Sequence, residues 1–466
     1  MSTEKNFWNV LDKYNQEVIQ KVELLNADQV ESALKKSLQS FDEYKKTSAE
    51  ERSEWLEKIH QKLSQEKERF VDLIIKEAGK PRSYAEAELD RSLATIKWGA
   101  SEALRFCGEV VPFDYGKGKG KKAITGRYPV GVILGISPFN FPLNLALHKI
   151  VPALATGNAI LIKPSHYTPL ALLAFEELVK ECGVPEGLFQ VICCDTDLSN
   201  ELVKEERIKM LSFTGSPKIG WMLKERAGKK KVLLELGGNA AVYVDKSSLT
   251  GEKEAQKIAK EICQGAYLYS GQICISTQRI FVHQDVRSLL EKALIKEIAT
   301  LKSGDPSDSE VIVGPLIADE HLERISSWVE EAVSEGAEIL CGGKIHEAKA
   351  NLYEATLLTK TKRGMKIVDE EAFAPVALIE SVNSIEEGIE KINDSRFGLQ
   401  AGVYTQNIDH MKLAHDELEV GGVIMNGVPG FRLDPMPYGG VKDSGLGREG
   451  LLYSMREMTE ERLLVF

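Results

Sequence analysis

The sequence lacks several features that would place it in familiar classes of protein. No uninterrupted apolar run reaches the roughly 20 residues of a membrane-spanning helix, so we expect no membrane partner. The formal net charge is −11 and there is no basic tail, which argues against nucleic-acid binding. No apolar stretch follows Met1-Ser2-Thr3-Glu4-Lys5, so we expect no signal peptide.

Paired cysteines and clustered histidines are missing as well. The seven cysteines are odd in number and none forms a CxxC motif, while the eight histidines show no metal-ligand spacing such as HExxH. These absences indicate a chain without a disulfide framework, which fits a reducing, cytoplasmic location. We also expect no structural or catalytic metal.

What the chain does contain is the composition of a soluble globular protein. Its 466 residues are too many for one ordinary core, so two or three domains are expected. Residues 48–110 read as helices. Ser48 and Glu51 form a capping box, an amphipathic run continues to Gly79, and a second helical stretch begins near Ser83 and passes Trp98.

From residue 130 onward, short apolar strands alternate with helices. This alternation predicts a parallel sheet covered by helices, and such sheets bind dinucleotides at the carboxyl ends of their strands. The expected strands are 130–136, 159–162, 189–192, 208–213 and 231–234, and the expected helices begin at Pro142, Thr168 and Pro217.

The alternation resumes after Gly237 and predicts a second α/β domain. A helix over 252–269, a strand over 279–282, and helices near 286–301 and 319–335 compose it. The basic tract 116–122 alternates Gly and Lys but lacks GxxxxGK[ST] spacing, so we interpret it as an exposed turn and not a phosphate loop.

Three short motifs carry the chemistry. In chain order they are Ser137-Pro138-Phe139-Asn140-Phe141-Pro142, Glu235-Leu236-Gly237-Gly238-Asn239 and Tyr269-Ser270-Gly271-Gln272-Ile273-Cys274. A carboxamide, a carboxylate and a thiol are the groups needed to oxidise an aldehyde through a thioester. Together the motifs resemble the aldehyde dehydrogenase superfamily, and the resemblance runs from about Ser48 to the C-terminus.

Each of the three residues has a catalytic and a structural interpretation. Cys274 is the expected nucleophile, although an isolated cysteine is usually a buried structural residue. Glu235 is the expected general base for the nucleophile or the hydrolytic water, with a salt bridge at a strand end as its alternative. Asn140, with the backbone N–H of Cys274, is expected to form an oxyanion hole, or else Asn140 caps the helix at Pro142.

The resemblance implies a fold and an activity. The expected fold is α/β and aldehyde dehydrogenase-like, with two Rossmann-like domains and a small β oligomerisation arm. The implied NAD(P)-binding domain covers 1–106 and 130–236, the catalytic domain 237–440, and the arm 107–129 with 455–466. The implied reaction oxidises a small aldehyde to the acid, and the apolar C-terminal segment suggests pairing between subunits of a homodimer or homotetramer.

The resemblance also identifies expected cofactor residues for NAD or NADP. They include Lys163 at a strand end, the turn before Pro217, and a glutamate–phenylalanine pair; the full set is Ile136, Ser137, Pro138, Phe139, Lys163, Ser165, His166, Thr214, Gly215, Ser216, Leu236, Glu371 and Phe373. Members that prefer NAD usually carry Glu three residues after the lysine, where this chain has His166. The missing carboxylate would not repel a 2′-phosphate, so NADP use is permitted; alternatively His166 points away and NAD binds.

On the substrate side, the expected residues are Arg91, Phe141, Asn144, His148 and Arg432. Their polarity resembles subfamilies that oxidise short hydroxy-, phospho- or phosphono-aldehydes, such as lactaldehyde and glyceraldehyde phosphate. The structural alternatives pair Arg432 with Asp434, pair Arg91 with Asp90 or Glu88, and make His148 a core histidine. Ile273 stands where some anion-selective relatives have arginine, which weakens the anionic interpretation.

Two other functions stay open at this stage. A CoA-acylating enzyme would transfer the acyl group to CoA, but Glu235 argues for hydrolysis instead. A catalytically silent binding or structural protein could use the same scaffold, although the joint presence of Cys274, Glu235 and Asn140 argues against it.

Overall fold

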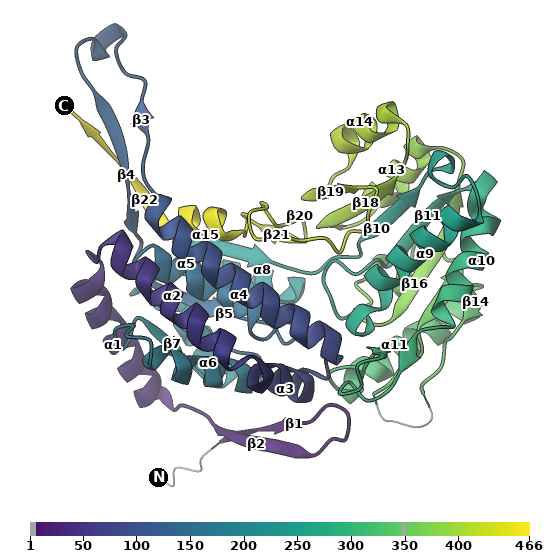
Figure 1. The fold of residues 1–466 in the computed structure, drawn as a ribbon, viewed down its shortest axis with the longest axis horizontal. Coiled ribbons are helices and arrows are strands. Elements are labelled where there is room, and N and C mark those ends of the chain that lie inside the picture. Colours follow the sequence, from purple (N-terminus) through teal and green to yellow (C-terminus); the bar gives the residue numbers. More distant parts are fainter. Residues whose placement is uncertain (1–5, 347–350) are drawn as a thin grey trace.

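The computed structural model describes residues 6–346 and 351–466 and shows two lobes with a projecting arm (Figure 1). Met1–Lys5, where we expected no signal peptide, lies outside the described residues. One hydrophobic core is built from residues 10–236 together with the segment 451–458, while separate cores begin at residue 241. The expected α/β fold class is confirmed.

The first lobe is organised around a six-stranded sheet with the order β21-β9-β8-β5-β6-β7. All neighbours are parallel except β21 and β9. The chain runs outward from β5 through β6 to β7 and then returns to β8 on the other side of β5, which creates a switch point at β5. The strands are β5 (Val132–Ile136), β6 (Ala159–Lys163), β7 (Phe189–Val191), β8 (Ile208–Thr214), β9 (Lys231–Glu235) and β21 (Gly445–Leu446).

Helices cover this sheet because their apolar residues recur at helical spacing. They are α5 (Asn144–Ala155), α6 (Leu170–Lys180), α7 (Thr196–Lys204) and α8 (Pro217–Arg226), preceded by α1 (Ala27–Tyr44), α2 (Ala49–Gln65), α3 (Lys67–Ala78) and α4 (Arg82–Arg105). The Ser48–Glu51 capping box opens α2 as expected. The run expected to continue to Gly79 is two helices, with Glu66 between them, and Gly79 ends the second at φ 64°.

Three further differences from the expected elements are visible. Helix α5 begins at Asn144 and not at Pro142. The N-terminal hairpin of β1 (Phe7–Leu11) and β2 (Val18–Glu23), together with α1, was not expected from the sequence. Short strands with mixed polarity, as in this hairpin, carry little periodic signal.

The second lobe contains a seven-stranded sheet with the order β14-β15-β16-β11-β10-β18-β19, parallel except at β14–β15. The strands are β10 (Ala241–Val244), β11 (Arg279–His283), β14 (Glu338–Cys341), β15 (Thr356–Thr359), β16 (Val376–Val382), β18 (Gln400–Tyr404) and β19 (Gly422–Met425). Its helices are α9 (Glu252–Tyr267), α10 (Arg287–Ile298), α11 (Asp319–Ser334), α12 (Lys366–Asp369), α13 (Ile385–Asn393) and α14 (Ile408–Glu417).

The arm is a three-stranded antiparallel sheet with the order β22-β4-β3 (Figure 1). Its strands are β3 (Val110–Val111), β4 (Ala123–Pro129) and β22 (Thr459–Val465), and α15 (Leu451–Glu457) leads into it. The Gly–Lys tract contributes one exposed 3-10 turn at Gly116–Gly118, as expected for a solvent-facing loop. Leu463 and Leu464 on the last strand, and Phe466 directly after it, are each more than half exposed.

Smaller elements complete the fold. They are the strand pairs β12 (Lys302–Ser303) with β13 (Val311–Val313) and β17 (Phe397–Gly398) with β20 (Val441–Lys442), and the 3-10 turns at Lys246–Ser248, Leu268–Gly271 and Gln284–Val286. Across residues 6–346 and 351–466, no helix is both long and apolar enough to cross a membrane. Within the same ranges, no group of three or more metal-ligating side chains is arranged to hold an ion.

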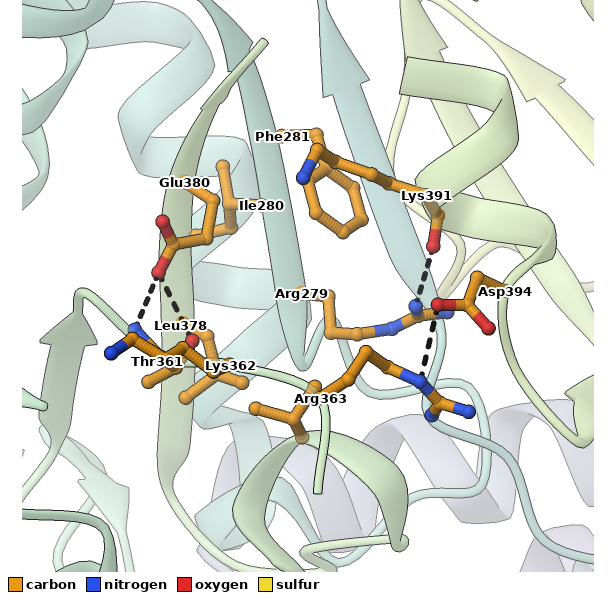
Figure 2. A pocket seen from close by; sticks show the side chains of 11 residues that line it. Arg279, Ile280, Phe281, Thr361, Lys362, Arg363, Leu378, Glu380, Lys391 and Asp394 are labelled. Atoms are coloured by element: carbon orange, nitrogen blue, oxygen red, sulfur yellow. Dashed lines mark hydrogen bonds and ion pairs between the residues drawn. The ribbon is translucent and has the colours of Figure 1, made fainter. Parts of the chain in front are cut away.

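A small cavity of about 100 Å³ in the second lobe is a structural feature and not a ligand site (Figure 2). Arg279, at the start of β11, donates to the carbonyl oxygens of Asn239, Lys391 and Ile392 at 2.9–3.1 Å. Arg363 pairs with Asp394 at 3.1 Å on the same side of the cavity. These charges already have protein partners, and Arg279 fastens the end of α13 to the sheet.

Candidate active site

The segment before Cys274 has an unusual backbone conformation. Tyr269, Ser270 and Gly271 all have positive φ, at 48°, 56° and 67°. For a bulky side chain such as tyrosine this region is strained, and it persists only where surrounding contacts enforce it. Tyr269 Oη donates to the carbonyl of Ala78 at 2.8 Å, and Ser270 Oγ donates to that of Gly314 at 2.5 Å.

Gln272 supplies the next anchor of the same loop. Its Nε2 donates to the Pro315 carbonyl at 3.2 Å, and its Oε1 accepts from the N–H of Ile317 at 3.0 Å. These contacts explain the Tyr-Ser-Gly-Gln order of the motif: each side chain fixes one residue of the turn to a distant segment. The turn therefore presents Cys274 in one defined position.

Cys274 lies part-buried where two cavities meet, since it lines both. Its Sγ is 3.1 Å from the hydroxyl of Tyr438. Burial raises the pKa of the Cys274 thiol to about 11, while the Tyr438 hydrogen bond and the charge of Arg432 act in the opposite direction. The other six cysteines are free, and four of them are buried.

Asn140 is buried beside the same loop and does not cap a helix. Its Nδ2 donates to the carbonyl of Gln272 at 2.9 Å. The N-terminus of α5 is capped by Glu88 instead, whose Oε1 accepts from the N–H groups of Leu143 and Asn144, both at 3.1 Å. The capping alternative for Asn140 is therefore wrong, and its amide is directed at the nucleophile loop.

Glu235 ends β9 and is buried, with 3 % of its surface exposed. Its Oε1 accepts from the N–H of Glu449 at 3.4 Å, whereas Oε2 has no hydrogen-bond partner among the described residues. Burial, followed by the nearby Glu449 charge, raises the pKa of Glu235 well above its usual value. It forms no salt bridge within the described ranges, contrary to the structural alternative.

Glu449 is the centre of a buried ionic cluster behind Glu235. Lys149 Nζ lies 2.7 Å from Glu449 Oε1 and also donates to Thr214 at 2.7 Å, while Arg432 Nη2 lies 3.1 Å from Glu449 Oε2. Burial acts to raise the pKa of Glu449, but Lys149 and Arg432 outweigh it, so the pKa is lowered. Of two neighbouring carboxyls, Glu449 is thus the charged one and Glu235 retains its proton to higher pH.

The larger cavity, about 500 Å³, lies at the carboxyl ends of β5, β6, β8 and β9. All the residues expected at a cofactor line it, namely Ile136, Ser137, Pro138, Phe139, Lys163, Ser165, His166, Thr214, Gly215, Ser216, Leu236, Glu371 and Phe373. The first turn of α8 opens here with Pro217 at its start, and Ser216 makes no side-chain capping bond. Free backbone N–H groups at such a helix end favour an anion.

Aromatic and cationic groups gather at the Lys163 end of this cavity. The rings of His166 and Tyr167 lie 3.9 Å apart, and Trp8 of the N-terminal hairpin is 6.2 Å from His166. Lys163 Nζ lies 5.3 Å from the Trp8 ring. Burial and the charges of Lys163 and Lys13 lower the pKa of His166, so its imidazole is neutral at physiological pH.

The opposite end of the cavity contains Glu371 and Phe373. Glu371 Oε1 accepts from the N–H of Gly238 at 3.0 Å, and a Cβ on Gly237 would collide with the Glu371 carboxylate. The two glycines of the Glu-Leu-Gly-Gly motif therefore admit this carboxylate close to the backbone. Burial raises the pKa of Glu371 to about 7.

The smaller cavity, about 260 Å³, lies on the other side of Cys274. Four of the five residues expected at the substrate line it: Arg91, Phe141, Asn144 and Arg432. His148 is not among the lining residues; it is buried, and its Nε2 lies 3.4 Å from Asp434 without hydrogen-bond geometry. Its interpretation as a core histidine fits the structure.

The arginine pairings differ from the expected alternatives. Arg432 pairs with Glu449 and not with Asp434. Asp90 pairs with Lys67, and Glu88 pairs with Lys80, so neither is an ion-pair partner of Arg91. Arg91 Nη2, Arg432 Nε and Asn144 Oδ1 are buried without hydrogen-bond partners among the described residues. Such groups at a cavity wall are expected to find partners in a ligand.

Sequence reasoning missed three residues that the structure brings to the site: Tyr438, Glu449 and Lys149. Lys149 follows His148 on α5, a position that helical spacing from Asn144 and Leu145 would have marked as inward-facing. Tyr438 and Glu449 lie in loops connected by a backbone bridge, with N···O distances of 2.8 and 2.6 Å. No periodic pattern predicts that pairing.

A cysteine at the junction of a dinucleotide-sized cavity and a smaller one that contains two arginines, with a buried carboxyl nearby, is the arrangement of a cysteine-dependent α/β dehydrogenase. The chain belongs to the Aldehyde dehydrogenase family, whose pattern matches residues 1–464. It is 39 % identical over 459 residues to the 3-sulfolactaldehyde dehydrogenase of Priestia megaterium, covering 98 % of this chain and 94 % of that relative.

Two solved structures are similar over the whole chain. Aldehyde dehydrogenase 21 from Physcomitrella patens, in complex with the reaction product succinate, has a TM-score of 0.96 and 33 % identity, covering 100 % of this chain and 96 % of that one. Glyceraldehyde-3-phosphate dehydrogenase GapN from Methanocaldococcus jannaschii, complexed with NADP, has a TM-score of 0.93 and 34 % identity, covering 100 % of both chains.

Proposed function

We propose that this enzyme oxidises a short aldehyde carrying a hydroxyl or an anionic group to the carboxylic acid, with NAD or NADP as oxidant. The observation that carries the proposal is the position of Cys274, which lines both cavities and can contact a substrate on one side and a cofactor on the other. Membership of the aldehyde dehydrogenase family supports the reaction class.

Cys274 acts as the nucleophile in this proposal. Its thiolate attacks the aldehyde carbon, and the carbonyl oxygen becomes an oxyanion that needs fixed donors. The Asn140 amide is held beside the loop by its bond to Gln272, and the N–H of Cys274 is the second proposed donor. A bound nicotinamide ring supplies the acceptor for the hydride that leaves the adduct carbon.

Glu235 then removes a proton from the water that hydrolyses the thioester. Its Oε2 has no hydrogen-bond partner among the described residues, so that oxygen is available to a water molecule. Because its pKa is raised, the basic form accumulates only as the pH rises. The presence of such a base favours hydrolysis over transfer to CoA.

The residues proposed to hold the dinucleotide fit the larger cavity. The uncapped turn of Ser216 at α8 suits a pyrophosphate, Lys163 suits a ribose, and Glu371 with Phe373 suits the nicotinamide end. A neutral His166 near Lys163 and Ser165 leaves no carboxylate at the ribose, which supports NADP competence. The NADP complex of the Methanocaldococcus jannaschii enzyme supports the same choice.

The substrate class is proposed from the unpaired polar atoms of the smaller cavity. The guanidinium groups of Arg91 and Arg432 can bind a carboxylate, phosphate or sulfonate, and Asn144 can bind a hydroxyl. One relative is named a 3-sulfolactaldehyde dehydrogenase, and one similar structure contains the product succinate. Both named compounds are anionic, which supports this class.

We further propose that the β3–β4–β22 arm joins subunits into a homodimer or homotetramer. Its exposed apolar side chains and free sheet edge would be covered by a second copy.

In the proposed division of the chain into domains, the first lobe binds the cofactor and the second lobe carries the nucleophile. The absence of disulfides within the described ranges supports the expected cytoplasmic location, which cell fractionation would test.

The deciding experiment is a NAD(P)H absorbance assay with a panel of short aldehydes, neutral and anionic, with either cofactor and with or without CoA. We expect turnover without CoA and a higher kcat/KM for hydroxylated or anionic aldehydes. A strict requirement for CoA would indicate the acylating reaction. Complete inactivity across the panel, with cofactor bound, would favour a silent scaffold protein.

A further inference from the structure

We propose that Tyr438 is a further catalytic residue, whose hydroxyl donates a hydrogen bond to the sulfur of Cys274 and so favours the thiolate. The inference rests on the proposed function, because it takes Cys274 as the nucleophile. The two atoms are 3.1 Å apart, within the limit for a hydrogen bond to sulfur. Tyr438 lies in the late loop, 164 residues from Cys274, and belongs to none of the three motifs.

Two other polar groups near the sulfur bind different partners, although Glu235 Oε2 and Arg432 Nε have none among the described residues. The Asn140 amide donates to the Gln272 carbonyl, and the bonded oxygen of Glu235 accepts from the backbone of Glu449. Tyr438 is the one hydrogen-bond partner of the sulfur within residues 6–346 and 351–466. The phenol is therefore the one group that acts on the sulfur by a direct hydrogen bond among the described residues.

Once Cys274 is a thiolate, the hydrogen bond has one possible direction, because only the Tyr438 hydroxyl then carries a proton. Burial, followed by the facing Cys274, raises the pKa of Tyr438 well above its ordinary value, so the phenol keeps its proton at any working pH. A phenol that keeps its proton donates, and a thiolate accepts more strongly than a thiol. The contact therefore stabilises the charged form of Cys274.

Two neighbouring features hold Tyr438 in position and strengthen it as a donor. The Arg432 guanidinium lies 3.7 Å from the centre of the Tyr438 ring, a cation–π contact that draws electron density from the phenol. The backbone of Tyr438 is bridged to Glu449, whose carboxylate in turn binds Arg432. The ring is thus fixed between its own backbone bridge and the arginine.

The test measures the acidity of Cys274 through its rate of alkylation by iodoacetamide as a function of pH, in enzyme without cofactor. The charged and titratable groups that face the thiol are Tyr438, Glu371, Arg432 and Glu235, and only the first is changed in Tyr438→Phe. In Tyr438→Phe we expect the midpoint of the curve of alkylation rate against pH to move to higher pH. Alkylation near neutral pH should slow by about tenfold or more. kcat/KM should fall in parallel while KM for the cofactor stays constant.

Tyr353→Phe is the matched control, because Tyr353 is also buried and its hydroxyl has no hydrogen-bond partner among the described residues. Its alkylation profile should equal that of the wild type. An unchanged midpoint in Tyr438→Phe, with mass spectrometry locating the label on Cys274, would overturn the role of Tyr438 while leaving the proposed function intact. Full turnover in Cys274→Ser would instead refute the proposed function.

A second variant tests the same hydrogen bond in case Tyr438→Phe misfolds. Site-specific 3-fluorotyrosine at position 438 keeps the ring and hydroxyl but makes the phenol a stronger donor. We expect the alkylation midpoint to move downward, opposite to the shift in Tyr438→Phe. A midpoint equal to that of the wild type would count against the hydrogen bond.

Discussion

The two cavities that meet at Cys274 are built in different ways. The cofactor side consists of turns at the ends of β5, β6, β8 and β9, where backbone groups and glycines face the space. The substrate side consists of side chains from α4 and α5 and from the loop 428–438, several of them buried polar groups without protein partners. Under the proposed function, the cofactor would meet turns at strand ends, while substrate choice would rest on a few side chains from two helices and a late loop.

The largest expected effect comes from changing Cys274, the residue that lines both cavities. Cys274→Ser should lower kcat by more than about 10³-fold, because a serine hydroxyl is a far weaker nucleophile than a cysteine thiolate. Cofactor affinity should stay within a factor of about two, since most of that cavity is unaffected. Turnover and NADPH fluorescence titration measure the two effects separately.

Cys107→Ser provides the control, because Cys107 is exposed and far from any motif. It should retain wild-type turnover. Comparable losses in both variants would mean that general damage, and not nucleophilic chemistry, explains the result.

Glu235→Gln should have the next largest effect, slowing steady-state turnover by about 10²-fold or more through loss of the base. Thioester should accumulate, with a burst of NAD(P)H if acylation needs no base. In the wild type, the raised pKa of Glu235 means that the carboxyl is protonated at low pH and basic above its pKa, so turnover should rise with pH. The variant should lose that rise.

Stopped-flow absorbance and acid-quench mass spectrometry would measure the burst and the thioester. Glu252→Gln is the matched control, since Glu252 lies exposed at the start of α9. A pH profile and turnover in Glu235→Gln identical to those of the wild type would remove Glu235 from the reaction.

On the cofactor side, strands β5 to β9 could be predicted from the sequence, whereas the residues expected at the cofactor came from the family resemblance. Each apolar strand of the first sheet was readable from its run of Val, Ile and Leu, and parallel strands bring their carboxyl ends to one edge. Lys163 ends β6 and Thr214 ends β8, so both lie at the edge of the sheet where the carboxyl ends of the strands meet. The exact start of α5 was missed, because Pro142 precedes the helix by two residues.

The substrate side could be predicted only in part. Arg91 and Asn144 were expected at the substrate from the family resemblance, and both line the cavity. The partner of Arg432 could not be inferred, since Glu449 reaches it through a loop bridge with no local signal. Asp434 is close in sequence but points toward Thr95, to which it bonds at 3.1 Å.

The third prediction compares the two arginines that line the smaller cavity. Arg91→Met removes a guanidinium that forms no ion pair among the described residues, so KM for anionic aldehydes should rise by about tenfold, with propanal nearly unchanged. Arg432→Ala should raise KM for anionic aldehydes by roughly 10–100-fold, about 1.4–2.8 kcal/mol. It should also impair propanal, because its loss removes one of the two cations that pair with Glu449 and the cation beside the Tyr438 ring.

Steady-state kinetics with matched anionic and neutral aldehydes would separate the two arginines. Arg226→Met is the control, because Arg226 is exposed at the end of α8. Equal losses on charged and neutral aldehydes in Arg91→Met would show that Arg91 stabilises the fold and does not select the substrate.

The last prediction concerns the cofactor side and compares the two cofactors with each other. His166→Glu would place a carboxylate three residues after Lys163, close to the expected ribose, and its charge would repel a 2′-phosphate. KM for NADP should rise by about tenfold, against a change of about twofold or less for NAD, since NAD lacks that phosphate. Initial rates with each cofactor at saturating aldehyde measure the ratio, and His415→Glu, an exposed histidine on α14, controls for the added charge. Because Tyr167 and Trp8 surround His166, a loss shared equally by both cofactors would mean that the imidazole supports this aromatic packing and does not choose the cofactor. A wild-type enzyme that does not use NADP at all would likewise contradict the proposed role of His166.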